Sequence, residues 1–143
     1  MHPAVERTLG KTLGIHQWLY DKTDGRIGAS ISGRPMLLLR TVGQRTGAAR
    51  TNALLYVPQG DAYAVIASKG GDPKHPGWYH NLVANPDVEV QVGRKHIPVR
   101  ARVAEGDERA TIWARADEIN KGGYTRYQAK TDRMIPVVVL EPR

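Results

Sequence analysis

The chain has 143 residues, with 21 Lys and Arg against 14 Asp and Glu, a formal net charge of +7, and no cysteine. That length suits a single domain, 1–143, with its own core, and the lack of cysteine excludes disulfides, thiolate nucleophiles and zinc–thiolate sites. The positive charge favours an anionic partner, such as a phosphate, a polycarboxylate or nucleic acid, or else it serves solubility alone.

The first predicted element is an N-terminal helix over about 3–20, where apolar residues recur at spacings of three and four. The longest apolar run, at 137–140, is far too short to span a bilayer. We therefore expect a cytoplasmic protein. A peripheral contact of the N-terminal helix with the inner face of the membrane stays open.

Strands dominate the rest of the chain. The run 36–42 is apolar without polar alternation, which is typical of a buried strand. The runs 88–92 and 96–103 alternate around a tight turn at 93–94, with Val103 expected inward and Pro98 marking an edge or a bulge. The remaining predicted strands are 51–57, then 62–68 after a four-residue turn, and 134–142.

Three short helices complete the predicted order. Pro76 can open the first, Asp107 is a fair N-cap for the second, and the third covers 124–130. Consecutive strands joined by short turns are antiparallel neighbours, and regular βαβ alternation is absent. The sequence therefore predicts a mainly β (α+β) fold of about six strands, a small closed or half-closed antiparallel barrel with peripheral helices.

No catalytic set of side chains stands out. None of the five histidines has a recognised metal-ligand spacing, so we predict no metal site. Ser68 lacks the G-x-S-x-G context of a hydrolase, and the carboxylates are scattered. These absences favour a binding protein or an enzyme whose chemistry belongs to a cofactor.

Two segments can hold a ligand. RTVGQRTGAAR, residues 40–50, places Gly43 and Gly47 where backbone amides can turn toward an anion, with Arg45 and Arg50 as donors. The alternative is a solvated basic hairpin. ASKGGDPKHPGWYHNLVANP, residues 67–86, offers paired glycines and Trp78 to a flat or phosphorylated ligand, although its aromatic residues can equally belong to the core.

A third cluster is a pair of tyrosines near the C-terminal end of the chain. Tyr124 and Tyr127 lie three residues apart and share one face of the predicted helix. They can line a pocket for a flat substrate or form a packing pair.

LLLRTVGQRTGAARTNALLYV, ASKGGDPKHPGWYHNLVANPDVEVQV and YQAKTDRMIPVVVLE together resemble the deazaflavin-dependent nitroreductase family of actinobacteria. The resemblance runs from about residue 3 to the C-terminus. It implies a split β-barrel of the FMN-binding type and coenzyme F-420 (8-hydroxy-5-deazaflavin) as cofactor. The implied activity is hydride transfer to an electron-poor small molecule, such as a quinone, a coumarin-like lactone or a nitro compound.

The resemblance also implies residue roles. The basic loop would hold the phosphate and acidic tail of the coenzyme, the second block would border its ring, and the two tyrosines would face ring and substrate as pocket walls or proton donor. The implied coenzyme-binding residues are Gln44, Arg45, Thr46, Arg50, Ile66, Ala67, Ser68, Lys69, Gly77, Trp78, Tyr79, His80, Asn81 and Tyr124.

Two departures and several alternatives remain. Family members often carry two basic residues where this chain has Gln44-Arg45, and the third tyrosine of the nitroimidazole-activating member is missing near Lys121. Nitroimidazole reduction is therefore not predicted. An FMN-dependent split barrel is the first alternative, and a basic nucleic-acid-binding barrel, suggested by charge alone, is the less favoured one, so no nucleic-acid partner is expected. We expect a monomer or a weak dimer.

Overall fold

The computed structural model describes residues 17, 18, 20–23, 30, 31 and 33–143. Most of the predicted N-terminal helix lies outside these residues, although residues 17, 18 and 20–22 are helical. In the part of the chain that is described, no helix has the length and apolar character needed to cross a membrane.

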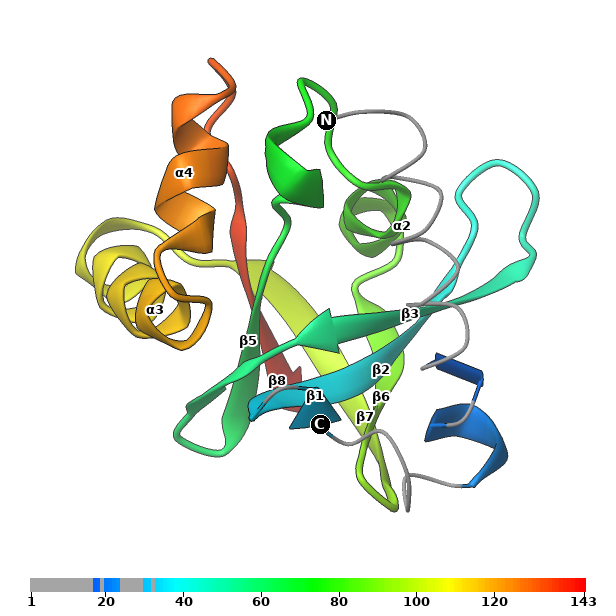
Figure 1. The fold of residues 1–143 in the computed structure, drawn as a ribbon. Coiled ribbons are helices and arrows are strands. Elements are labelled where there is room, and N and C mark those ends of the chain that lie inside the picture. Colours follow the sequence, from blue (N-terminus) through cyan, green and yellow to red (C-terminus); the bar gives the residue numbers. More distant parts are fainter. Residues whose placement is uncertain (1–16, 19, 24–29, 32) are drawn as a thin grey trace.

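The strands form one curled antiparallel sheet in the order β1-β2-β6-β7-β8-β5-β4, and β3 pairs with β2 outside this order (Figure 1). This is a split barrel, which confirms the predicted mainly β fold. The strands are β1 (Ser30–Ile31), β2 (Arg34–Val42), β3 (Ala49–Leu55), β4 (Val57–Gln59), β5 (Ala62–Ile66), β6 (Asp87–Val92), β7 (Lys95–Val103) and β8 (Val137–Pro142).

Helices pack against both faces of the sheet, and Trp78 and Leu82 of one of them join the interior core cluster. α3 (Gly106–Ile119) packs against β4, β5 and β8, and α2 (Gly77–Ala84) packs against β2. α4 (Gly123–Ala129) packs against α3 and against the 3-10 turn η1 (Lys69–Gly71). In Figure 1, α3 and α4 stand on one side of β5, whereas α2 stands on the other. Both short predicted helices, after Pro76 and over 124–130, are confirmed.

The unbroken apolar runs belong to strands buried on both faces. In β8, Val138 and Leu140 enter the barrel interior, while Val137 and Val139 pack under α3 with Ile112. β2 is buried in the same way, because Leu37 and Leu39 face inward and its other face is covered by Tyr20. A strand that is buried on both faces needs no alternation of apolar and polar residues.

Three strand predictions need correction. The run 51–57 is two strands, because the chain bends at Tyr56, whose N–H donates to Pro35 O at 3.1 Å, and Val57 then pairs with β5. The run 62–68 ends as a strand at Ile66, because Ser68 already has helical dihedral angles. The turn before it is shorter than expected, since 58 and 59 lie within β4.

Two further details differ from the sequence prediction. Glu105, not Asp107, is the N-cap of α3, because Gly106 has a left-handed φ of 58° and turns the chain one residue earlier. Val103 is 44% exposed rather than inward. Pro98 lies in β7 between β6 and β8, but it is opposite the end of β8, where its carbonyl accepts from the Arg143 N–H at 3.0 Å.

Candidate functional site

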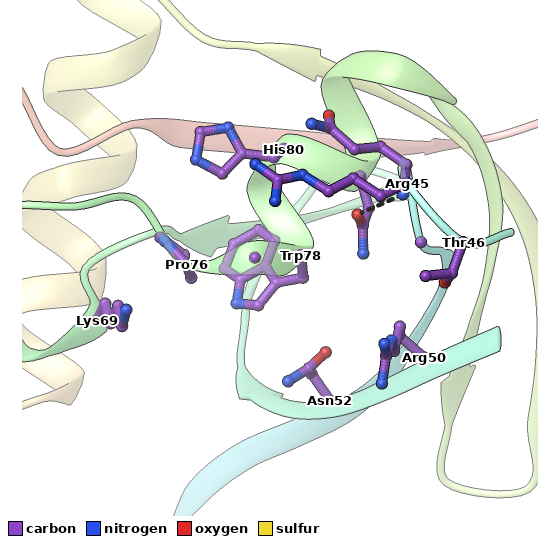
Figure 2. Close-up of a pocket in the computed structure, with 12 residues that line it drawn as sticks. Arg45, Thr46, Arg50, Asn52, Lys69, Pro76, Trp78 and His80 are labelled. Atoms are coloured by element: carbon purple, nitrogen blue, oxygen red, sulfur yellow. Dashed lines mark hydrogen bonds between the residues drawn. The ribbon is translucent and has the colours of Figure 1, made fainter. Parts of the chain in front are cut away.

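A cavity of about 840 Å³ lies between the β2–β3 loop, β3, η1 and the N-terminal end of α2. It joins the two segments that the sequence singled out, although they are separated along the chain. In Figure 2, Lys69 and Pro76 lie toward one end, Thr46 and Arg50 toward the other, and Trp78 between them. The lining residues are Gly43, Gln44, Arg45, Thr46, Arg50, Asn52, Lys69, Pro76, Gly77, Trp78, His80 and Asn81.

The β2–β3 loop is closed by its own backbone. The Gly43 N–H donates to Ala48 O, and the Gly47 N–H donates to Gly43 O, both at 2.8 Å. Gly47 has a φ of 72°, a conformation that residues with a side chain rarely adopt. Thr46 tightens the turn by accepting the Ala48 N–H at 3.2 Å through Oγ1. The Gly43 and Gly47 amides are thus used within the loop and do not turn toward an anion as the sequence suggested. The exposed side chains of Arg45, within the turn, and Arg50, after it, line the cavity instead.

The cavity is lined by cations without carboxylates. No Asp or Glu is among its lining residues. Among the residues that the structure describes, Arg45, Arg50 and Lys69 form no salt bridge. By contrast, Arg40, which lies within β2, donates to Asp21 at 2.9 Å and is paired within the fold. Three cations that have no carboxylate partner in the described part of the chain surround one cavity and favour an anionic ligand.

Asn81 connects α2 to the basic loop. Its side-chain carbonyl accepts the Gln44 N–H at 3.1 Å, the dashed bond in Figure 2, and its amide donates to Thr41 Oγ1 at 3.1 Å. Asn81 and Thr41 are both buried. The side chain therefore fixes the position of Gln44, at the start of the loop, relative to the helix that carries Trp78.

The opposite end of the cavity is bordered by a left-handed turn. Lys69, Gly70 and Gly71 have φ values of 46°, 63° and 84° in succession. A Cβ on Gly71 would lie only 2.6 Å from the carbonyl oxygen of Tyr127, so η1 and α4 are in direct backbone contact. Only a residue without a side chain permits this approach.

The structure gathers nine of the predicted coenzyme-binding residues around the cavity and leaves five away from it. Ile66, Ala67 and Tyr124 are buried in the core, Ser68 is half-buried, and Tyr79 stacks on His75 at 4.6 Å. Tyr127 does not line the cavity either. Its ring meets that of Tyr124 at 6.2 Å, edge to face. The nine lining residues are Gln44, Arg45, Thr46, Arg50, Lys69, Gly77, Trp78, His80 and Asn81.

Tyr124 has an unusual environment. Burial, more than any other cause, raises the pKa of its hydroxyl well above the ordinary value, and nearby Tyr127 adds to the effect. Its hydroxyl therefore keeps its proton at neutral pH.

Sequence reasoning missed Asn52 as a lining residue. It lies two residues after Arg50 on β3, and alternate residues of a strand share one face. That spacing was the available signal. In the described part of the chain, no three His, Asp or Glu side chains gather as metal ligands.

Comparisons with known proteins identify the family of the chain. Residues 12–142 match the family model described as F420H(2)-dependent quinone reductase. An F420H(2)-dependent quinone reductase of Mycobacterium tuberculosis is 49% identical over 143 residues, covering 97% of this chain and 96% of the relative.

Two solved structures are also similar. One, described as an F420-H2 dependent reductase, is 49% identical, covers 76% of this chain and 95% of its own, and has a TM-score of 0.68. Another, described as a domain-swapped dimer, is 44% identical, covers 87% of this chain and 97% of its own, and has a TM-score of 0.70.

Proposed function

The chain belongs to the F420H(2)-dependent quinone reductase family, and we propose that it is an oxidoreductase that uses coenzyme F-420 to reduce a small electron-poor molecule. The finding that carries the proposal is the cavity, which combines unpaired cations with Trp78 along one continuous space. A cofactor with a flat ring and an anionic tail needs both features at once.

The residues at the two ends of the cavity suit the two parts of such a coenzyme. Arg45, Thr46 and Arg50 would hold the phosphate and acidic tail, since guanidinium groups bind these groups through paired hydrogen bonds. Lys69 and Trp78 would border the ring. When bound, the reduced deazaflavin ring supplies a hydride to the acceptor.

The protein's own contribution is binding and orientation. No carboxylate is among the described residues that line the cavity, and we propose that the proton that completes the reduction comes from solvent or from a tyrosine. Tyr124 and Tyr127 stay the predicted candidates, although neither lines the cavity, and burial, which raises the pKa of Tyr124, makes its hydroxyl a weaker acid than that of an ordinary tyrosine. We propose a quinone as the acceptor class, with activated alkenes such as coumarin-like lactones and nitro compounds as further candidates.

Titration of the protein with oxidised and reduced coenzyme tests the proposal. Replacing both free arginines, Arg45→Ala with Arg50→Ala, should weaken binding by about a hundredfold, because two charge-assisted contacts are lost. The control is Arg115→Ala with Arg126→Ala, which removes the same charge from two exposed residues that do not line the cavity. Equal affinities for the two double variants would refute the assignment of Arg45 and Arg50 to the acidic tail of the coenzyme.

The same titration separates the FMN alternative. FMN carries a phosphate but not the long acidic tail, so the proposed site should bind it more weakly than the deazaflavin. Tighter binding of FMN would overturn the choice of coenzyme.

Size-exclusion chromatography with light scattering would decide between the proposed monomer or weak dimer and a stable dimer.

A further inference from the structure

Arg133 lies in the connection between α4 and β8 and does not line the cavity. Its half-buried guanidinium faces residues 67–75, named here the 67–75 segment, which contains Lys69. Nε donates to Asp72 O at 2.8 Å, and Nη2 donates to Ser68 O at 2.7 Å. Nη1 donates to Ala67 O at 3.2 Å. One side chain thus holds three backbone carbonyls of the segment.

A fourth contact continues toward the cavity. Nη1 of Arg133 lies 2.9 Å from Nδ1 of His75. A guanidinium only donates, so Nδ1 accepts and His75 is neutral with its proton on Nε2. The His75 ring lies 4.6 Å from Tyr79 and 5.7 Å from His80, which lines the cavity.

Besides Arg133, η1 in this segment packs against α4, and Lys130 Nζ donates to Gly70 O at 3.4 Å, but among the described residues the backbone bonds from the 67–75 segment to the rest of the fold are few. The Ala67 N–H donates to Pro136 O at 2.9 Å, and this is the last backbone bond that the segment makes to β8 or the connection before it. Beyond it, the backbone bonds within the segment are local, from Gly71 N–H to Ser68 O and from Asp72 N–H to Lys69 O. Lys69 is also held at a φ of 46°, which is unfavourable for a residue with a side chain. Such a conformation persists only when the surrounding structure enforces it.

We propose that Arg133 is a positioning residue for coenzyme binding, which clamps the 67–75 segment so that Lys69 stays at the ring end of the cavity. This inference rests on the proposed function for its ligand. A lysine cannot replace it, because a single ammonium group does not reproduce the planar fork that reaches four acceptors.

Hydrogen exchange of the coenzyme-free protein tests the clamp directly. Arg133→Lys keeps the charge and should speed exchange of the amides in 68–75 by about tenfold, because bonds from a charged donor are lost. Exchange in the β2–β3 loop should stay unchanged. The matched control is Arg143→Lys, since Arg143 also donates to backbone carbonyls, of Val99 and Val88, and does not line the cavity. Unchanged exchange in 68–75 would overturn the proposal.

Binding of two ligands tests the consequence. The probes are the intact coenzyme and the deazaflavin with its ribityl chain but without phosphate and tail. Arg133→Lys should weaken both by a similar factor of about ten, because the damage lies at the ring end. The Arg45→Ala and Arg50→Ala double variant should weaken only the intact coenzyme.

An effect of Arg133→Lys on the intact coenzyme alone would also overturn the proposal. If this variant does not fold, His75→Ala, which removes one of the four contacts, should produce a smaller change in the same direction, and no change would refute the clamp. Failure of the wild-type protein to bind either probe would refute the proposed function, while the exchange experiment would still decide the clamp.

Discussion

Lys69 shows how a single residue at this site is held against its backbone preference. It has a left-handed φ of 46° in a turn where the next two residues are glycines, and its side chain lines the cavity. A glycine would adopt this conformation without strain. The presence of lysine is consistent with a role for its charge, since the backbone alone favours glycine.

Lys69→Gly should therefore weaken coenzyme binding about tenfold, while the free energy of unfolding changes by less than about 1 kcal/mol. The relief of strain and the greater entropy of the unfolded chain roughly offset each other. Lys121→Gly is the matched control, because Lys121 also has a positive φ, of 55°, and lies outside the cavity. Thermal unfolding and coenzyme titration of both variants would check this, and a large loss of affinity in Lys121→Gly would contradict it.

At the scale of elements, the contact between η1 and α4 has no spare room. Gly71→Ala would place a Cβ 2.6 Å from Tyr127 O and should destabilise the fold by about 2–4 kcal/mol through overpacking and backbone strain. Gly70→Ala is the control, because Gly70 also has a positive φ but a Cβ added there would meet no other atom within 4 Å. It measures the backbone strain alone, so the difference between the two variants gives the cost of the clash. Urea unfolding would compare the two, and equal losses would show that the close approach is unimportant.

His75, in the same region, should make the stability of the fold depend on pH. Burial, the charge of Arg133 and the nearby His80 lower the pKa of His75 from 6.5 in the folded protein. The unfolded chain then takes up a proton at His75 more readily, so this contribution to stability is complete above about pH 6.5 and is lost as the pH falls below it.

His75→Gln should remove that part of the pH dependence. The free energy of unfolding, measured by urea at several pH values from about 7.5 to 5, should therefore fall less steeply in the variant than in the wild-type protein. The three described carboxylates with a lowered pKa, Asp87, Glu108 and Asp117, titrate at more acidic pH and do not interfere. Parallel curves for the two proteins would contradict the assignment.

For the whole molecule, the net charge of +7 is unevenly distributed over the surface. Arg100 and Arg102 are paired with carboxylates on the barrel, whereas Arg45, Arg50 and Lys69 surround the cavity without such partners among the described residues. Affinity for the intact coenzyme should therefore fall as salt rises from about 50 to 500 mM, because these exposed charges are screened. The affinity for the deazaflavin fragment without phosphate and tail should change little with salt in a parallel titration. An equal loss of affinity for both ligands would show that these three cations do not hold the phosphate and tail.

Local signals in the sequence predicted the barrel and much of the site. Glycines in a turn, arginines beside them and Trp78 after Pro76 all act close to their own position in the chain, so their placement followed from local rules. The bend at Tyr56 did not, because it depends on a bond to Pro35 across the sheet. The contacts of Arg133 with residues far along the chain were equally invisible before the topology was known.

The place of β8 between β5 and β7 has a consequence for how the protein is made. The 67–75 segment leaves the ribosome well before Arg133 and the strand that follows it. Until these emerge, β5 lacks one of its two neighbours and the ring end of the cavity lacks its clamp. Coenzyme capture should therefore wait until Arg133 and β8 have emerged, and a nascent chain released before residue 133 would carry the basic loop without a competent pocket.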